Sequence, residues 1–256
     1  MDPGLDDELQ RRWGAFWGAS EGRPTVTITV TKGDGTTWLP PGPPGERYRI
    51  EAQADDDGLL VVSYRFALAL ESPSTWRLVV EETPQEPLGR IVENAARYLV
   101  ARLAAEAGGM ALHGAGIARQ GKAWVFAGPS RSGKSTAVSL TQGESLGDDF
   151  AVVLPAQAGW SVPAVPFDNG ENGSVQTTPP TPLASVLRLH QAPEARLSRP
   201  QGPLAHASLM ACLAFPWALP DLGARLDDAV GSLVAAGLFA ELWFAPDASF
   251  WDLLDA

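Results

Sequence analysis

A short glycine loop carries the residues of this sequence that are best suited to chemistry. Residues 128–135 read Gly-Pro-Ser-Arg-Ser-Gly-Lys-Ser and match the pattern Gly-x-x-x-x-Gly-Lys-Ser/Thr in full. The glycines let the backbone curl so that successive N–H groups point inward, toward phosphate oxygens. Lys134 would then reach the β- and γ-phosphates, and the Ser135 hydroxyl would ligate Mg²⁺, a hard cation that prefers oxygen. The loop therefore predicts a cradle for nucleotide phosphates.

Chance is a poor explanation of this match. The chain has three lysines in all (Lys32, Lys122 and Lys134), and one of them occupies the required position. The loop also follows an apolar strand-like segment and precedes a helix-like one, which is the context that the motif requires. We therefore assign a run of consecutive residues to phosphate binding: Gly128, Pro129, Ser130, Arg131, Ser132, Gly133, Lys134, Ser135 and Thr136.

Two adjacent aspartates follow the loop closely. Asp148 and Asp149 come 13 and 14 residues after Ser135, on the next predicted strand. A transport or recombination ATPase would place its acidic residue much farther along the chain, and a switch GTPase would need an Asn-Lys-x-Asp-like stretch, which the sequence lacks. Beside a metal-bound triphosphate, two carboxylates fit one metal or water ligand and one proton acceptor. The pair is therefore predicted to be functional rather than a solvated turn.

The elements that position these residues are predicted from hydrophobic periodicity. The N-terminal part has strand patterns separated by Gly, Pro and Asp turns, at 25–30, 47–52, 59–66 and 76–81. Segment 88–107 repeats apolar residues at helical spacing and stops before Gly108-Gly109. We expect a mostly antiparallel β-rich lobe over residues 1–87.

The rest of the chain alternates strand and helix patterns. Strands are predicted at 111–118 and 123–128, and a helix from the Gly-Lys-Ser-Thr stretch to about Thr141. The next strand leads into the two aspartates, and the segment Phe-Ala-Val-Val-Leu-Pro continues it. Farther along, we predict a strand near 184–190, helices near 203–214 and 223–236, a strand at 239–244 and a short closing helix. The predicted fold class is α/β, with a nucleotide-binding domain over residues 88–256.

Composition excludes several classes of function. The net charge of −11 and the pI near 4.7 argue against a nucleic-acid binder, which needs a basic face. No apolar run of about 18 residues occurs, so no membrane span is predicted. The acidic, polar N-terminus has no apolar core of a secretory signal, and we expect a cytoplasmic protein. The single cysteine, Cys212, rules out an internal disulfide and is expected to be buried. A homo-oligomer is left open.

The segment from His113 to Leu154 resembles the HPr kinase/phosphorylase family, which shares its fold with ATP-dependent phosphoenolpyruvate carboxykinase. The shared pattern is His-Gly before one strand, the glycine loop on the next strand, and a double Asp after the helix. Here it reads "LHGAGIARQGKAWVFAGPSRSGKS", followed by "LGDDFAVVL". The chain looks closer to the shorter HPr-kinase-like proteins of bacterial peptide-biosynthesis clusters, such as lasso-peptide kinases, than to HPr kinase itself.

This resemblance implies a kinase that uses ATP and Mg²⁺ and phosphorylates a serine/threonine-type hydroxyl of a peptide or small protein. It implies Asp149 as the base that takes the proton of the acceptor hydroxyl, with Asp148 beside it as a metal ligand or supporting group. His113 would orient the carboxylate or tune its charge, and Lys134 would hold the transferred phosphate. The implied fold of the nucleotide-binding domain is the HPr kinase/carboxykinase-like P-loop type, whereas the β-rich N-terminal lobe predicted above does not resemble that of HPr kinase.

The resemblance leaves other roles open. It covers residues 95–160 well, but the sequence matches neither the further acidic metal ligand of HPr kinase nor its dephosphorylation loop, and Asp168 and Glu171 are only candidates for that ligand. Four arginines could contact phosphate or an acceptor carboxylate, and the alternative for each is a solvated surface side chain. They are Arg131, Arg188, Arg196 and Arg199. His190 and His206 are given no role. The alternatives are a small-molecule kinase or carboxykinase-like phosphoryl transferase, and a non-catalytic nucleotide-binding regulator.

Overall fold

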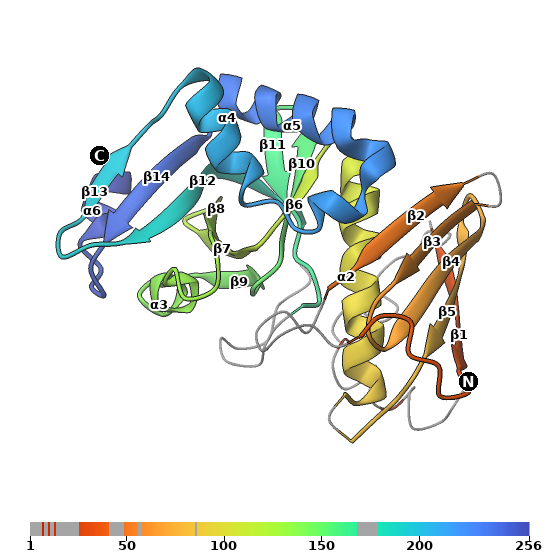
Figure 1. Ribbon diagram of the computed structural model, residues 1–256. Helices are drawn as coiled ribbons and strands as arrows, with labels where there is room; N and C mark the ends of the chain where they lie inside the picture. Colours follow the sequence, from red (N-terminus) through yellow and green to blue (C-terminus); the bar gives the residue numbers. More distant parts are fainter. Residues whose placement is uncertain are drawn as a thin grey trace. The chain divides into compact units, whose positions relative to one another are not determined.

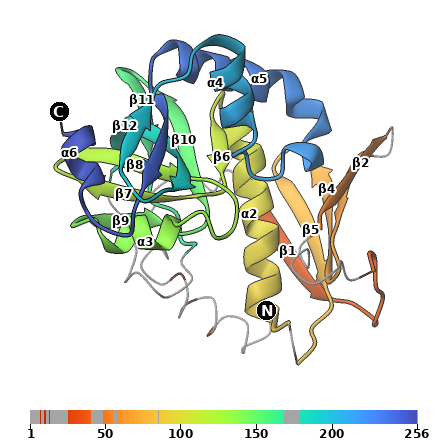
Figure 2. The same cartoon turned by 60° about the vertical axis from the view of Figure 1, so that its left-hand side comes forward.

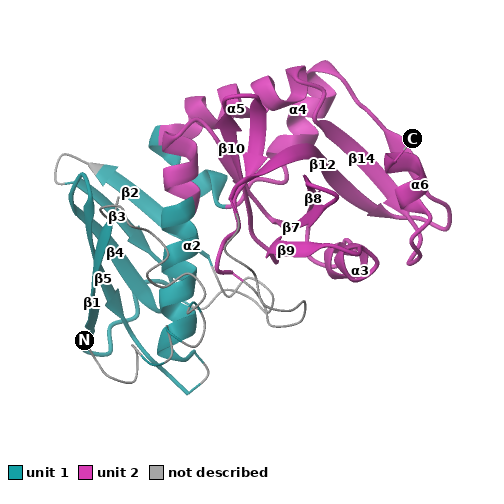
Figure 3. Ribbon diagram, turned by 180° about the vertical axis from the view of Figure 1, so that it is seen from behind, with its two compact units in different colours: residues 1–100, 215–221 teal, residues 101–214, 222–256 magenta. Residues whose placement is uncertain are grey.

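The structure is a computed structural model that describes residues 7, 10, 13, 26–40, 49–55, 58–84, 86–167 and 179–255. It is a mixed α/β fold with two sheets (Figure 1). The chain forms two compact units (Figure 3), one of residues 1–100 with 215–221 and the other of residues 101–214 with 222–256. The metal-ligand candidates Asp168 and Glu171 lie outside the described residues.

The first unit contains a five-stranded sheet of order β1-β5-β4-β3-β2. Strand β1 runs parallel to β5, and the other neighbours are antiparallel. The strands are β1 (Thr27–Lys32), β2 (Glu51–Asp55), β3 (Gly58–Val62), β4 (Phe66–Ser72) and β5 (Thr75–Val80). The single strand predicted over 59–66 is therefore wrong. The chain reverses at residues 63–65, where Ser63 N donates to Phe66 O at 2.9 Å.

Helix α2 (Leu88–Glu106) confirms the predicted helix over 88–107. It ends at Glu106, and Gly108 shortly after it has a φ of 77°, the left-handed conformation that commonly follows a helix. Within the first unit, Tyr98 on this helix donates its hydroxyl to Ala218 O at 3.1 Å. Trp217 donates its indole N–H to Ile50 O at 3.1 Å, so both bonds join segment 215–221 to this unit. That segment contains η2 (Pro216–Ala218) and begins η3 (Pro220–Leu222).

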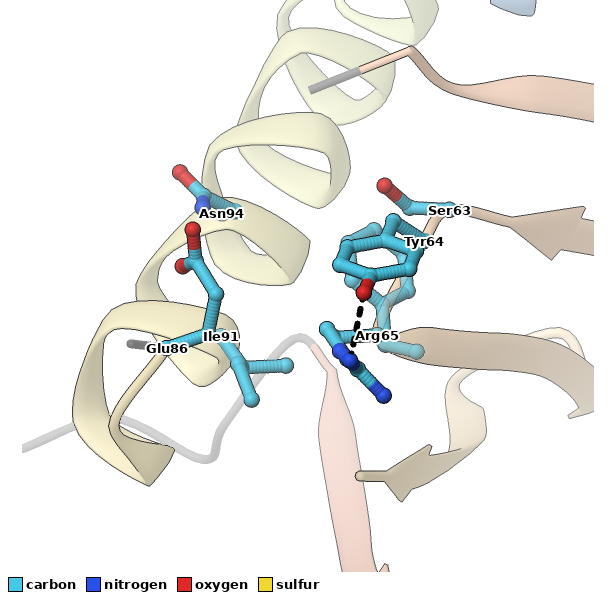
Figure 4. A pocket seen from close by; sticks show the side chains of 7 residues that line it. Ser63, Tyr64, Arg65, Glu86, Ile91 and Asn94 are labelled. Carbon is cyan, nitrogen blue, oxygen red and sulfur yellow. Dashed lines mark hydrogen bonds between the residues drawn. The ribbon is translucent and has the colours of Figure 1, made fainter. Parts of the chain in front are cut away.

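A small pocket in the first unit lies between the turn after β3 and α2 (Figure 4). In this turn Arg65 donates to the Tyr64 hydroxyl at 2.5 Å and lies 4.0 Å from the centre of the Tyr64 ring. Ile91 and Asn94 line the pocket from the helix. Its volume is about 10 Å³, room for about one water molecule, so it is no candidate for a substrate site.

The second unit contains a nine-stranded sheet. Figure 2 labels its strands β6 to β12. Its main order is β6-β10-β11-β12-β8-β7-β9, with β14 also beside β12 and β13 beside β14. Strands β8, β12 and β14 run parallel to one another, and the remaining neighbours are antiparallel. The bounds are β6 (Met110–Leu112), β7 (Gly114–Arg119), β8 (Lys122–Ala127), β9 (Glu144–Gly147), β10 (Ala151–Ala156), β11 (Gly159–Val162), β12 (Thr181–Gln191), β13 (Arg196–Ser198) and β14 (Phe239–Phe244).

Helices lie on both faces of this sheet (Figure 1). They are α3 (Lys134–Ser139), α4 (Gly202–Met210), α5 (Gly223–Ala235) and α6 (Phe250–Leu254). Leu187 and Leu189 of β12 pack in one core with α3 and α6. One residue along, Arg188 points to the other face because strand side chains alternate, and its guanidinium donates to Ser208 Oγ of α4 at 2.7 Å. No helix of the described residues is both long and apolar enough to cross a bilayer.

Phe126 is central to the core on the α3 and α6 face. It is fully buried and packs edge-on against Phe250 and Trp251, with ring centres 6.0 and 6.2 Å away. Phe126→Ala is expected to destabilise the fold by about 3–5 kcal/mol, since it removes a buried ring and leaves a cavity. Urea unfolding measures this loss. Leu204→Ala is the control because Leu204 is 70 % exposed, and a Phe126→Ala loss no larger than that of the control would contradict the assignment.

Candidate functional site

The candidate residues meet at one end of the strands of the nine-stranded sheet, an end that is called an edge of the sheet below. Strands β8, β12 and β14 are parallel, so their carboxyl ends share this edge. Strand β9 runs in the same direction, because β7 is antiparallel to both β8 and β9. The glycine loop after β8, the two aspartates after β9 and the start of β7 therefore come together there. The sheet topology, rather than any local signal, makes them neighbours.

The glycine loop, residues 128–133, joins β8 directly to α3. Gly128 and Gly133 have φ values of 148° and 102°, in the region that favours glycine. A Cβ atom on Gly128 would lie 2.8 Å from Ser132 Oγ, and one on Gly133 would lie 2.7 Å from Cζ of Phe244. Both positions therefore exclude a side chain for two reasons, conformation and space.

His113 occupies a break between two strands. The strand predicted over 111–118 is wrong as one element, because β6 pairs with β10 whereas β7 pairs with β8. The His113 backbone N–H donates to Cys212 O at 2.8 Å, and its carbonyl accepts from the Gly128 N–H at 3.0 Å. The backbone of His113 is thus bonded both to the segment after α4 and to the first residue of the glycine loop.

The two aspartates also lie at a break. The sequence predicted one strand through Asp148 and Asp149, but β9 ends at Gly147 and β10 begins at Ala151 with different neighbours. Asp148 is 3 % exposed, and its N–H donates to Phe167 O at 2.9 Å. Asp149 has a φ of 58°, a left-handed conformation that Asp tolerates better than most residues. Its side chain is 39 % exposed. The adjacent carboxylates therefore have different surroundings, one buried and one accessible.

Three side chains converge beside the glycine loop. The His113 Nε2 and Asp149 Oδ1 atoms are 2.7 Å apart, and Lys134 Nζ lies 3.4 Å from the same carboxylate oxygen. Lys134 is 7 % exposed and donates to the carbonyls of Gly128 and Pro129 at 3.0 and 3.1 Å. The carboxylate and these two carbonyls compensate the burial of the ammonium charge. An imidazole, a carboxylate and an ammonium thus share one small site.

The contact between His113 and Asp149 assigns a tautomer to the imidazole when the carboxylate is ionised. At 2.7 Å the imidazole Nε2–H donates to the carboxylate, which has no proton of its own to give when ionised. Lys134 Nζ lies 3.4 Å from the same ring nitrogen, but an ammonium group is only a donor and cannot accept the ring N–H. Asp149 is therefore oriented from two sides by donors, the arrangement expected of a carboxylate held in place for chemistry.

The remaining loop residues differ in exposure. Ser132 Oγ is a buried side-chain oxygen that has no hydrogen-bond partner within the described part of the chain. The carbonyl of Arg131 accepts from Gln191 Nε2 at 2.8 Å. Pro129, Ser130, Arg131 and Ser135 are exposed, whereas Thr136 is half-buried. The side chains of Lys134 and Gln191 thus hold the loop by hydrogen bonds to its carbonyls, and its exposed residues face solvent.

The oxygen donors present suit Mg²⁺. Mg²⁺ is commonly bound through one or two protein oxygens with waters and substrate phosphates completing its coordination. Ser135 supplies an exposed hydroxyl at the start of α3, and Asp148 supplies a carboxylate. Within residues 86–167 and 179–255, as in the other described segments, no group of three or more His, Cys, Asp or Glu is arranged to hold a metal.

Arg196 and the two histidines that were given no role have structural partners of their own. The Arg196 guanidinium lies 3.9 Å from the centre of the Trp243 ring, and His190 stacks on the same ring at 4.5 Å. Burial lowers the pKa of His190, although nearby Glu241 partly opposes this effect. His206 pairs with Asp227 at 2.8 Å in a second, unrelated His–Asp contact. Sequence reasoning missed Gln191 and the Cys212 carbonyl, because long-range contacts of ordinary residues leave no local pattern.

Cys212 offers a direct probe of the site's framework. Burial raises the pKa of its thiol to about 11, so at pH 8 roughly one thiol in a thousand is ionised. We expect no reaction with a thiol reagent such as Ellman's reagent at pH 8 until the protein is unfolded. The folded state also keeps a proton that the unfolded thiol loses near pH 9, so stability falls as the pH rises from about 9 toward 11. Rapid labelling of the native protein would contradict the buried position.

The comparison with known families covers this entire site. The family model of SynChlorMet cassette protein ScmC matches residues 79–212 of the 256, more than half of the chain. The chain belongs to the ScmC family. The ScmC match includes His113, the glycine loop and both aspartates, and it ends at Cys212. ScmC is described as a protein of a cassette. The comparison with curated proteins gave no match.

Proposed function

We propose that this ScmC-family protein is an ATP- and Mg²⁺-dependent kinase of the HPr kinase-like type. It transfers the γ-phosphoryl group to a serine/threonine-type hydroxyl of a peptide or small protein. One observation carries the proposal: the His113 imidazole, the Asp149 carboxylate and the Lys134 ammonium converge beside a loop with the full P-loop pattern. Phosphoryl transfer needs this combination of a phosphate holder and a modest base.

The loop supports the binding of phosphates. Its glycines bring the backbone close to a ligand, and Lys134 supplies a positive charge at the loop. Ser132 Oγ is a buried hydroxyl that a phosphate oxygen would satisfy as hydrogen-bond acceptor. In this proposal Ser135 and Asp148 hold Mg²⁺, which when bound neutralises charge on the phosphates.

Asp149 is the proposed proton acceptor. Its carboxylate is 39 % exposed, so an acceptor hydroxyl can approach it. The His113 N–H and the Lys134 ammonium, both donors, orient the carboxylate. The hydroxyl oxygen forms its bond to the γ-phosphorus, the bond from that phosphorus to the bridging oxygen of ATP breaks, and the hydroxyl proton passes to Asp149. Most of the rate comes from positioning and electrostatics, so a weak base suffices.

The family description bears on where to look for the acceptor. ScmC is described as a cassette protein, and in this proposal the acceptor is a peptide or small protein encoded beside the gene. The accessible carboxylate at a sheet edge leaves room for a hydroxyl on a flexible chain.

The proposal is tested by transfer of label. The purified protein is incubated with Mg²⁺, γ-³²P-ATP and two sets of acceptors, peptides encoded beside the gene and small hydroxyl compounds. Label on a peptide serine or threonine, located by mass spectrometry, is the expected result. Label on small molecules alone would favour a small-molecule kinase or a carboxykinase-like transferase. Tight ATP binding without transfer to any acceptor would favour a non-catalytic regulator.

A further inference from the structure

A cavity lies beside the glycine loop, on the side opposite to Asp149. It has a volume of about 450 Å³, within the range of small-molecule sites, and six residues line it: Gly133, Thr136, Gln191, Ala192, Phe244 and Pro246. Strand β8 lies between β12 and β7, and β14 lies beside β12. Gln191 and Phe244 end β12 and β14, whereas Asp149 follows β9 beyond β7. The cavity and the carboxylate therefore flank the loop on opposite sides.

This placement gives a bound nucleotide a direction. The inference rests on the proposed function, in which Lys134 and Asp149 mark the position of the terminal phosphate. A triphosphate that extends along the loop from that end brings its α-phosphate, which is joined to the nucleoside, toward Thr136 and the side of Gly133 that faces the cavity. We propose that the cavity binds the nucleoside of the phosphoryl donor, with the ribose and base between α3 and the ends of β12 and β14.

The lining determines how the base is recognised. None of the six lining residues is charged, and the only polar side chains among them are those of Thr136 and Gln191. One N–H of the Gln191 amide donates to Arg131 O at 2.8 Å, which leaves its second N–H as a donor and its amide oxygen as an acceptor. Phe244 is 3 % exposed and fixed against Gly133, so it forms a rigid apolar wall. The cavity thus offers shape and apolar contact but few directed hydrogen bonds.

Weak discrimination between purines follows from this chemistry. Guanine presents two neighbouring donors, N1–H and the 2-amino group, which a carboxylate would recognise, and the lining contains no carboxylate. Apolar pockets without matched polar groups discriminate weakly, whereas matched polar groups discriminate by orders of magnitude. The cavity therefore accepts ATP and GTP with affinities within about tenfold of each other.

The test separates nucleoside binding from phosphate binding. Ala192→Trp places an indole in the cavity, and Ala158→Trp, in the exposed turn between β10 and β11, is the matched control. Isothermal titration calorimetry measures the affinities of each protein for ATP, GTP and inorganic tripolyphosphate, each with Mg²⁺. We expect Ala192→Trp to lower the affinities for ATP and GTP at least tenfold. Tripolyphosphate should bind this variant as tightly as it binds the wild type and the control. ATP and GTP should bind the wild type within tenfold of each other.

The outcomes distinguish the inference from the proposed function. Wild-type ATP affinity in a folded Ala192→Trp protein, or a preference of more than a hundredfold for one purine, overturns the inference and leaves the kinase proposal standing. A wild-type protein that binds neither ATP nor tripolyphosphate overturns both. If Ala192→Trp also fails to bind tripolyphosphate, a second variant replaces it. This variant is Pro246→Trp, at an exposed residue of the cavity lining, and it is judged by the same criteria.

Discussion

Asp149→Asn is expected to keep ATP binding and to lose phosphoryl transfer by about 10²–10⁴-fold, the contribution typical of a positioned base. Asn is nearly isosteric with Asp and, like Asp, tolerates the left-handed φ of 58° at this position. Its amide oxygen can still accept the His113 N–H, so the site keeps its shape. An amide does not take up the proton of the acceptor hydroxyl, and only the chemical step suffers.

The measurement is a single-turnover assay together with ATP titration. ATP affinity in Asp149→Asn should equal or slightly exceed that of the wild type, because a negative charge near the terminal phosphate is removed. Asp227→Asn is a matched control, since Asp227 also pairs with a histidine, at 2.8 Å, but lies on α5 away from the loop. Transfer by Asp149→Asn at the rate of this control would refute its role as base.

Lys134→Ala is expected to weaken both ATP binding and transfer. A hydrogen bond to a charged group contributes about 1.5–3 kcal/mol, so if the ammonium contacts two phosphates, as proposed, its loss reduces ATP affinity by about a hundredfold or more. The side chain is 7 % exposed, and its removal also frees two loop carbonyls and Asp149 Oδ1 from their donor. Both effects act against phosphate binding.

Lys122→Ala provides the comparison for this variant. Lys122 begins β8 and is exposed, at the opposite end of the strand from the loop. Circular dichroism and thermal unfolding establish that both variants are folded, and calorimetry gives their ATP affinities. An ATP affinity in Lys134→Ala within about threefold of that in Lys122→Ala would contradict the proposed phosphate cradle.

Local chemistry made part of this structure predictable from sequence. Glycines at residues 128 and 133 are required by positive φ and by close neighbours, so the loop pattern carries its own geometry. Periodicity identified α2 and α5, whose bounds differ by at most one residue from the predicted helices. The strand predicted at 239–244 is confirmed by β14. In each of these segments the pattern of apolar residues and the observed burial agree.

Long-range pairing made the rest unpredictable. In the run 110–119, Gly114 beside His113 is a weak turn signal, and it does not show that the two halves of the run belong to different neighbours, β10 and β8. The Gly-Asp-Asp stretch at 147–149 is a stronger turn signal, but it does not show that β9 pairs with β7 whereas β10 pairs with β6. Sheet partners are chosen by the whole fold, and local composition does not encode them. The breaks that sequence reasoning missed are the places where His113 and Asp149 lie.

The two backbone bonds of His113 have a practical consequence for protein engineering. A designer who transplants only the segment from Gly128 to Ser135 into another strand–helix scaffold would move the anion receptor alone. The transplant would lack the imidazole of His113, because His113 lies outside that segment and its backbone is hydrogen-bonded to both Cys212 and Gly128. A working module must include three segments distant in sequence, so new acceptor preferences are better sought by altering the natural chain than by building the centre elsewhere.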